Sequence, residues 1–175
     1  MGEARRSGFP ATVFHPGHIV GPGWPIVNPQ GNFNPKIFGQ LAQGQEVVLP
    51  NLGMETVHHV HASDLADIVM QSLANWSNAV GESFHAVSPA AVTLRGYAEA
   101  MADWFGQPAK LAFLPLEAWE KTVPEADAKA TREHISRSPN CSIDKAKRLL
   151  NYQPRYSSLQ GAKEAVMWLR ENNRF

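Results

Sequence analysis

The stretch from residue 16 to residue 35 constrains the fold of this chain most, because prolines and glycines interrupt it throughout. They stand at Pro16, Gly17, Gly21, Pro22, Gly23, Pro25, Pro29, Gly31 and Pro35. This density forbids a regular helix or strand of any length. Long loops in compact domains are usually functional or disordered, and the apolar side chains embedded in this one predict that it is ordered. We therefore expect a long, ordered loop near the start of the chain.

Short strands alternate with helices along the rest of the 175 residues. Apolar runs and alternation predict strands at residues 9–14, 46–49, 57–62, 83–87 and 111–114. Apolar residues at helical spacing predict helices at residues 35–43, 63–76, 93–105, 115–121, 125–134, 142–150 and from 157 or 158 to the C-terminus, and residues 3–8 resemble the end of a helix. This order indicates one α/β or α+β domain.

Individual residues sharpen these predictions. Caps are expected at Asn34, Ser63, Thr93 and either Ser157 or Ser158. The strand at residues 9–14 is expected to be buried. The helix at residues 63–76 is expected to bury one stripe, namely Leu65, Ile68, Val69, Ser72 and Leu73.

Composition excludes several classes of protein. Lys plus Arg is 16 and Asp plus Glu is 16, so the formal net charge is zero and binding to nucleic acid by bulk charge is not expected. The hydrophobic fraction of 43% and the charged fraction of 18% exclude a disordered chain. The single Cys141 excludes an intramolecular disulfide, which favours a reducing, cytoplasmic setting. No stretch approaches the roughly 18 apolar residues needed to span a membrane.

Three isolated signals for chemistry are weak. His58, His59 and His61 could contribute to a zinc site, but local hydrogen bonding is the more ordinary role for histidines on a strand, and we assign no metal ligand. A lone cysteine such as Cys141 more often packs than reacts. The glycines of residues 17–23 match neither the dinucleotide-binding nor the P-loop spacing.

Four segments, in order, resemble one family. They are residues 9–23 (FPATVFHPGHIVGPG), 60–66 (VHASDLA), 81–88 (GESFHAVS) and 144–157 (DKAKRLLNYQPRYS). Together they resemble the second half of extended short-chain dehydrogenases/reductases, the NAD-dependent epimerase/dehydratase family. The resemblance implies an α/β chain, a mixed α+β substrate lobe of a Rossmann-type fold without its N-terminal nucleotide-binding βαβ units. Residues 1–25 would be the last part of the Rossmann core with the nicotinamide-side loop, and residues 26–175 the substrate lobe.

The resemblance also implies a site. Its nicotinamide wall would consist of Pro16, Gly17, His18 and Ile19. Its substrate side would consist of Trp24, Asn32, Phe33, Asn34 and His59. The cofactor of the parent enzyme would be NAD or NADP, bound only loosely by this chain alone.

Two parts of the family's machinery are missing from the sequence. No Gly-x-x-Gly-x-x-Gly turn occurs. No tyrosine has a lysine four places later, since Tyr97 is followed by Met101, Tyr152 by Tyr156, and Tyr156 by Gln160. We therefore assign no catalytic residue and expect the chain alone to be inactive.

The substrate and the partners stay open at this point. Val57 and His15 stand where family members that use nucleotide sugars often have arginine, so the resemblance implies a nucleotide-diphosphate sugar no more strongly than another small hydroxyl- or carbonyl-bearing substrate. The alternative function is a stand-alone, non-catalytic module that binds a partner or forms a homodimer, because removing half of the fold would expose a sheet edge.

Overall fold

The computed structural model describes residues 6–175. Its strands are β1 Val13–Pro16, β2 His18–Val20, β3 Val47–Pro50, β4 Thr56–Val57, β5 His59–His61, β6 Ser83–Ala86, β7 Val92–Thr93 and β8 Leu111–Leu114. Its helices are α2 Lys36–Ala42, α3 Ala62–Ala74, α4 Trp76–Ala79, α5 Leu94–Trp104, α6 Leu116–Trp119, α7 Glu125–Ile135, α8 Asp144–Leu150 and α9 Ser158–Glu171, with a 3₁₀ turn, η1, at Glu120–Thr122. No helix in this range is long and apolar enough to cross a membrane.

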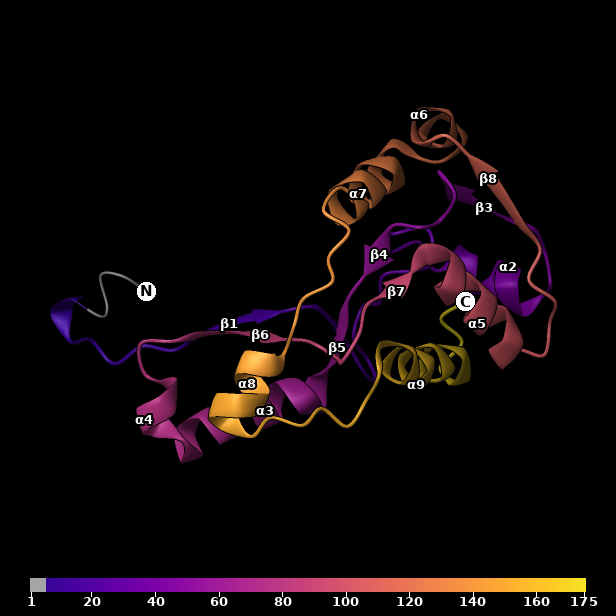
Figure 1. Ribbon diagram of the computed structural model, residues 1–175. Coiled ribbons are helices and arrows are strands. Elements are labelled where there is room, and N and C mark those ends of the chain that lie inside the picture. The colour runs from indigo at the N-terminus through magenta and orange to yellow at the C-terminus, as the bar shows by residue number, and fades with distance from the viewer. Residues whose placement is uncertain (1–5) are drawn as a thin grey trace.

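The elements form two arms that meet near β5 (Figure 1). One arm holds β1, β6, α3, α4 and α8, and the other holds β3, β8, α2, α5, α6, α7 and α9. Each arm has its own apolar cluster. Phe84, Ile68 and Leu150 lie in the first cluster, and Phe38, Tyr97 and Val166 lie in the second. The first arm is therefore assembled from segments on both sides of the long loop.

The strands pair in four two-stranded sheets. The pairs β1–β6, β2–β5 and β3–β8 are parallel, and β4–β7 is antiparallel. Parallel pairing places the carboxyl ends of both strands at the same edge. In the first pair His15 lies opposite His85, and in the second His18 lies opposite His59.

Gly17 is the point at which the chain passes from one arm to the other. It stands between β1 and β2, its N–H donates to the carbonyl of Ala86 (3.1 Å), and the next N–H, of His18, donates to the carbonyl of His58 (2.8 Å). A Cβ at Gly17 would lie 2.3 Å from that His58 oxygen. Only glycine permits this approach, so residue 17 fixes how closely the two parallel pairs can lie.

Most of the predicted elements are present. The loop at residues 16–35 is ordered and contains β2, and its polar residues Asn28 and Asn32 are fully buried. Thr93 caps α5, and Ser157 caps α9 in a capping box with Gln160. The predicted end of a helix at residues 3–8 falls partly outside the described residues, and Gly8 has a φ of 71°, as a helix stop requires.

Two predictions about burial and one about a cap are wrong. The first strand begins only at Val13 and is mostly exposed, because within the described residues it pairs on one side only. Val69 and Leu73 of α3 are exposed. The helix packs on the arm through its other side, where Asp64, Ile68 and Ser72 are buried. The cap of α3 is the imidazole of His61, which accepts a hydrogen bond from the N–H of Ser63.

The close backbone contact at Gly17, where the two arms join, leads to a prediction about the free energy of unfolding. Gly17→Ala should lower the free energy of unfolding by about 1–3 kcal/mol, because the clashing atom is backbone and one strand pair must shift. Gly39→Ala is the matched control: it lies inside α2 with only the ring edge of Phe175 4.0 Å from its Cβ, and it should be neutral or stabilising by about 0.5–1 kcal/mol. Urea denaturation of both variants checks this, and equal stabilities would show that the junction does not constrain the fold.

Candidate functional site

A pocket of about 350 Å³ opens where β1 and β6 end. It is lined by His15, Pro16, Gly17, His18, His58, His85, Val87, Pro139 and Cys141. Ligands of open parallel sheets bind in the crevice outside the carboxyl ends of the strands. The lining includes three of the four residues predicted for the nicotinamide wall. The fourth, Ile19, alternates to the other side of β2 and is not among the lining residues.

His58 is held in one tautomer at the back of this pocket. Its Nε2 lies 2.9 Å from the carbonyl oxygen of Ser88, which can only accept, so Nε2 carries the proton. Its Nδ1 accepts from the N–H of Cys141 (3.2 Å) and must therefore be bare. Burial lowers the pKa of His58, in agreement with this neutral form.

A row of aromatic side chains leads inward from the pocket. The rings of His18 and His59 lie 6.1 Å apart, and the ring of His59 lies 5.4 Å from that of Tyr97. Burial, and then the neighbouring His134, lower the pKa of His18 to about 4. Burial, and then the neighbouring His18 and His58, lower the pKa of His59 to about 3. Both imidazoles are therefore neutral at physiological pH.

His59 and Tyr97 are buried without hydrogen-bond partners. Both ring nitrogens of His59 and the hydroxyl of Tyr97 lack a partner in the described part of the chain. His59 is completely buried, so it supports the side chain of His18 from behind and does not line the pocket. The sequence predicted His59 on the substrate side of the site, and the structure places it one layer of side chains beneath the surface of the pocket.

Of the predicted substrate residues in the long loop, the two asparagines bond to α7 and the two aromatic residues are exposed. Asn32 donates to Thr131 Oγ1 (3.0 Å), and Asn34 donates to a carboxylate oxygen of Asp127 (2.8 Å). Both asparagines are therefore engaged in fixing the loop to α7. Phe33, between them, is 49% exposed.

Phe33 and Trp24 both expose their rings, in different surroundings. The ring of Phe33 lies 5.2 Å from the ring of His134. His134 in turn lies 4.8 Å from His18, which lines the pocket. Trp24 follows a turn closed by its N–H on the carbonyl of Gly21, and it does not line the pocket. Phe33 is thus the predicted substrate residue that the fold connects to the pocket through ring contacts.

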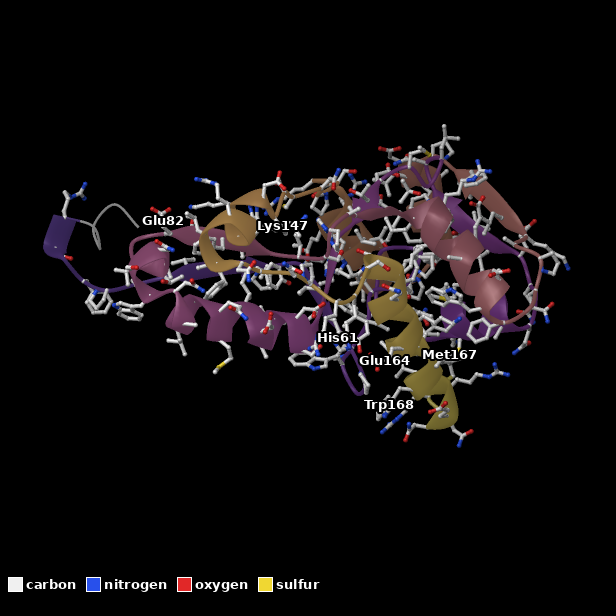
Figure 2. All side chains as sticks on the ribbon, turned by 60° about the horizontal axis from the view of Figure 1, so that its bottom comes forward. His61, Glu82, Lys147, Glu164, Met167 and Trp168 are labelled. Atoms are coloured by element: carbon white, nitrogen blue, oxygen red, sulfur yellow. The ribbon has the colours of Figure 1, made fainter. Side chains whose placement is uncertain are left out.

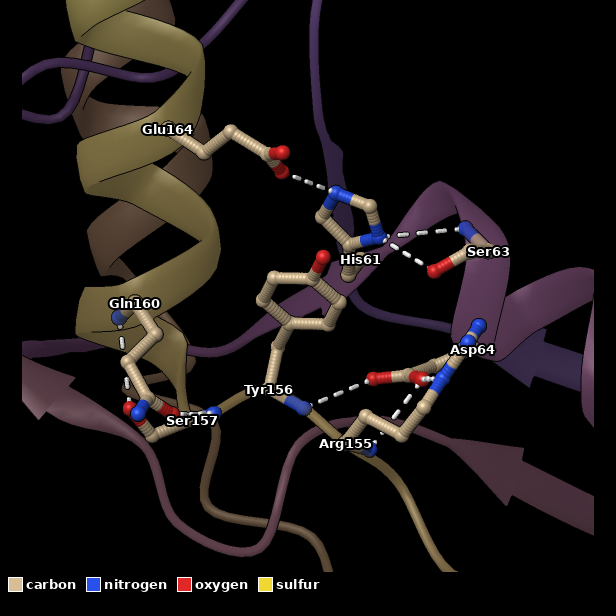
Figure 3. A network of polar contacts seen from close by, with 8 residues as sticks. All are labelled: His61, Ser63, Asp64, Arg155, Tyr156, Ser157, Gln160 and Glu164. Atoms are coloured by element: carbon tan, nitrogen blue, oxygen red, sulfur yellow. Dashed lines mark hydrogen bonds and ion pairs between the residues drawn. The ribbon is translucent and has the colours of Figure 1, made fainter.

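A network of polar contacts ties the two arms together beside the site (Figure 3). Nε2 of His61 lies 2.6 Å from a carboxylate oxygen of Glu164, and its Nδ1 lies 2.6 Å from the hydroxyl of Ser63. The ring of Tyr156 stacks on His61 at 3.9 Å. Figure 2 shows Glu164 on the side of α9 that faces His61. The network joins β5 to α9 and so holds the pocket's supporting strand in place.

Asp64 fastens the turn that precedes α9. Its buried carboxylate accepts the N–H groups of Arg155 and Tyr156, both at 3.1 Å. The side chain of Arg155 adds a contact at 3.4 Å. Asp64 therefore does more than complement the dipole of its own helix, because it fixes a segment 91 residues away.

The three neighbouring histidines of residues 58–61 do not converge. His58 contacts Ser88 and Cys141, His61 contacts Glu164, and His59 lies in the core. Within residues 6–175 no group of three His, Cys, Asp or Glu side chains is arranged to hold a metal ion.

Sequence reasoning did not assign six of the nine lining residues to this site, nor His134 beside it. The six are His15, His58, His85, Val87, Pro139 and Cys141. The pairing of β1 with β6 brings His85 to His15, and no local sequence pattern predicts that pairing. His134 reaches the site because its Nδ1 donates to the carbonyl of Gly31 (2.6 Å), across 103 residues of chain.

Similarity to known proteins is found at the level of the fold. No family model matches the sequence, and no curated protein matches it. Solved structures do match. An epimerase from Methanothermobacter thermautotrophicus shares 23% identity at a TM-score of 0.67, covering 98% of this chain and 46% of that chain.

Two further solved structures match almost all of this chain over about half of their own length. A UDP-glucose 4-epimerase from Thermotoga maritima, with UDP-glucose, has a TM-score of 0.66 and 19% identity over 97% of this chain and 49% of that chain. A dTDP-glucose 4,6-dehydratase from Bacillus anthracis, in complex with NAD, has a TM-score of 0.67 and 16% identity over 99% and 49%. The fold is thus a partial epimerase/dehydratase fold, as predicted, and the chain spans about half the length of these structures.

The buried histidines predict how stability depends on pH. Between pH 7 and pH 5 the unfolded chain takes up protons on His18 and His59, at a pKa near 6.5, while the folded chain does not. Stability therefore falls as the pH falls, by about 2 kcal/mol for each of the two histidines. Urea denaturation at the two pH values measures the loss, and His59→Leu should reduce it by about 2 kcal/mol. An undiminished loss in the variant would contradict the assignment to His59.

Proposed function

We propose that this chain is the substrate-side half of an NAD(P)-dependent epimerase, dehydratase or reductase, and that the pocket beside Gly17 takes the nicotinamide ring. The observation that carries the proposal is the position of the pocket, at the carboxyl ends of the parallel strands β1 and β6. The NAD-bound dehydratase from Bacillus anthracis, which has the same fold over half its length, supports the choice of cofactor.

The residues of the pocket fit a nicotinamide ring. Pro16, Val87 and Cys141 supply apolar surface, and the neutral imidazole of His18 supplies a hydrogen-bonding edge. No lysine or arginine lines the pocket, so this chain would hold the ring and leave the pyrophosphate to another part of the enzyme. When bound, the cofactor supplies hydride transfer.

None of the three tyrosines suits the role of the family's catalytic tyrosine. Burial raises the pKa of both Tyr97 and Tyr152, whereas a general acid/base needs a lowered phenol pKa. Tyr156 stacks on His61 and does not line the pocket. We therefore propose that the acid/base group comes from the nucleotide-binding half of the enzyme, and that this half is required for turnover.

The first arm offers a surface on which such a half would fit. Within the described residues β1 pairs with β6 only, and parallel sheets in proteins are normally covered on both faces. The outer side of α3 exposes Val69, Met70 and Leu73. Further parallel strands beside β1, with a helix against α3, would bury this apolar surface.

A second function is favoured by the same exposed edge. A stand-alone module would cover β1 and the outer side of α3 with a second copy of itself. Light scattering, combined with a titration of the pocket with a nicotinamide ligand, separates the two proposals. A homodimer whose pocket does not respond to the ligand would favour the non-catalytic module.

The pocket assignment can be tested on the chain by itself. Nicotinamide mononucleotide should shift the NMR signals of His15, His85 and Cys141 with a dissociation constant of the order of millimolar, because only one end of the cofactor is recognised. Adenosine monophosphate should not shift them. Cys141→Phe should abolish the response by filling the pocket, and the near-isosteric Cys141→Ser should retain it.

Thermal denaturation of both Cys141 variants shows whether they are folded. A response to both nucleotides alike, or an unchanged response in folded Cys141→Phe, would show that the nicotinamide ring binds elsewhere.

A further inference from the structure

A hydroxyl, an imidazole and a carboxylate follow one another beside the first turn of α3 (Figure 3). The hydroxyl of Ser63 lies 2.6 Å from Nδ1 of His61. Nε2 of the same ring lies 2.6 Å from a carboxylate oxygen of Glu164. None of these three side chains lines the pocket at the ends of β1 and β6. The proposed function therefore makes no use of this set of contacts, which we call the relay.

We propose that the relay makes Ser63 a nucleophile toward activated acyl esters, and that the chain has an esterase activity of its own. Ser63 and His61 are the catalytic residues of this activity, and Glu164 is a positioning residue. The activity needs no cofactor and does not rest on the proposed nicotinamide pocket.

The hydrogen bonds of His61 fix the tautomer that a general base needs. The backbone N–H of Ser63 can only donate, and it lies 3.2 Å from Nδ1, so Nδ1 carries no proton. The hydroxyl of Ser63 therefore donates its hydrogen to the same nitrogen. Nε2 carries the ring proton and donates it to Glu164. A base that accepts the hydrogen of a hydroxyl, and that a third group orients, is the arrangement by which proteins activate serine.

Packing holds the imidazole in this position. The ring of Tyr156 stacks on it at 3.9 Å and an angle of 16°. A Cβ at Gly21 would lie 3.2 Å from Nε2, and a Cβ at Gly161 would lie 3.6 Å from the ring on another side. His61 is only 8% exposed, which limits the access of water to its ring. The base is thus fixed against the nucleophile before any substrate binds.

A close approach of α9 brings the carboxylate to the ring. Gly161 lies three positions before Glu164, on the same side of the helix. A Cβ at Gly161 would lie 2.8 Å from the side chain of Val20, so glycine lets α9 lie against β2 at backbone distance. In the described part of the chain the ion pair of Glu164 is with His61. Its charge therefore stabilises the imidazolium that forms when His61 takes a proton.

The chemical step balances with these groups and water. Ser63 Oγ forms a bond to the carbonyl carbon of the ester while its proton passes to Nδ1 of His61. The bond from that carbon to the alkoxy oxygen then breaks, and His61 gives the proton to the departing alcohol. Water attacks the acyl-serine in the same way, with His61 taking and returning the proton, and releases the acid.

The surroundings of Ser63 favour a small acyl group. Ser63 is half-buried, so a bulky ester would meet the neighbouring side chains. The N–H of Asp64 belongs to the first turn of α3, where helix N–H groups have no i−4 partner within the helix. It follows the nucleophile directly in the chain and is the nearest backbone donor in sequence for the oxyanion. An acetyl ester is therefore the probe for turnover.

A fluorophosphonate tests the relay on the full chain without cofactor. An activated serine attacks its phosphorus, fluoride leaves, and a stable phosphonyl group stays on the serine oxygen. Peptide mass mapping should find this group on Ser63. It should not find it on Ser157, which also caps a helix but whose hydroxyl oxygen accepts from the N–H of Gln160. Unfolding the chain in urea should abolish the labelling.

Variants assign a role to each group. Ser63→Ala should abolish the adduct and lower the hydrolysis of 4-nitrophenyl acetate by about tenfold or more. His61→Asn keeps a capping side chain on α3 but removes the base, so it should slow labelling by about 100-fold. Glu164→Gln keeps an oxygen for Nε2 but removes the charge, and it should slow labelling by about tenfold.

A pH profile separates positioning from a merely structural role of Glu164. Labelling should become faster with rising pH, as the imidazole loses its proton. In Glu164→Gln the rise should occur at lower pH, because the charge that favours the protonated ring is gone. The other ionisable groups near the ring are Tyr156, which stacks on it, and the ion pair of Asp64 with Arg155 in the next layer, and all three stay unchanged in the variant.

Three results would overturn the inference: no adduct on Ser63, labelling of Ser157 as fast as that of Ser63, or an unchanged labelling rate in folded His61→Asn. Thermal denaturation shows which variants are folded. If His61→Asn is not folded, the rate in Glu164→Gln decides, and an unchanged rate there contradicts the relay. None of these results bears on the binding of nicotinamide mononucleotide at Cys141, so the proposed function stands or fails separately.

Discussion

The backbone contact between Gly17 and His58 is the constraint on which the rest of the structure depends. Residue 17 ends the pairing of β1 with β6 and begins the pairing of β2 with β5, and both arms are joined there. The contact leaves no room for a side chain. It also fixes the position of the next residue, His18, which lines the pocket.

Desolvation gives this site its chemical character. The imidazoles of His18, His58 and His59 all have lowered pKa values, with burial as the main cause. Four of the nine pocket residues are histidines, and the two of them whose pKa values are lowered, His18 and His58, are uncharged at neutral pH. A pocket without lysine or arginine fits the nicotinamide ring of the proposed function, and it disfavours phosphate and carboxylate groups.

Local structure could be predicted from the sequence because its signals are local. The cap at Ser157, the strand at Leu111–Leu114 and the turn at Gly106 follow from residue types within a few positions. The four family-like segments predicted the fold that the solved structures share. Burial was predicted less well, since alternation and helical stripes do not reveal which faces of β1 and α3 have a neighbour.

The site could be predicted only in part, for the same reason. Pro16, Gly17 and His18 are consecutive, so one family-like segment was enough to suggest them. His85, Cys141 and His134 come from three distant segments and meet the site through strand pairing or single hydrogen bonds. Asn32 and Asn34 were predicted to bind substrate, and the structure shows how fully their amides serve to fix the loop.

The most direct test of the account is a crystal structure of the chain soaked with NADH. The account predicts density for the nicotinamide ring against Pro16 and Gly17, at the carboxyl ends of β1 and β6, with the ring edge toward His18. Its pyrophosphate should extend away from the protein's described residues, because no cation lines the pocket. Density for the adenine end in this pocket, or a nicotinamide ring bound to any other part of the chain, would contradict the account.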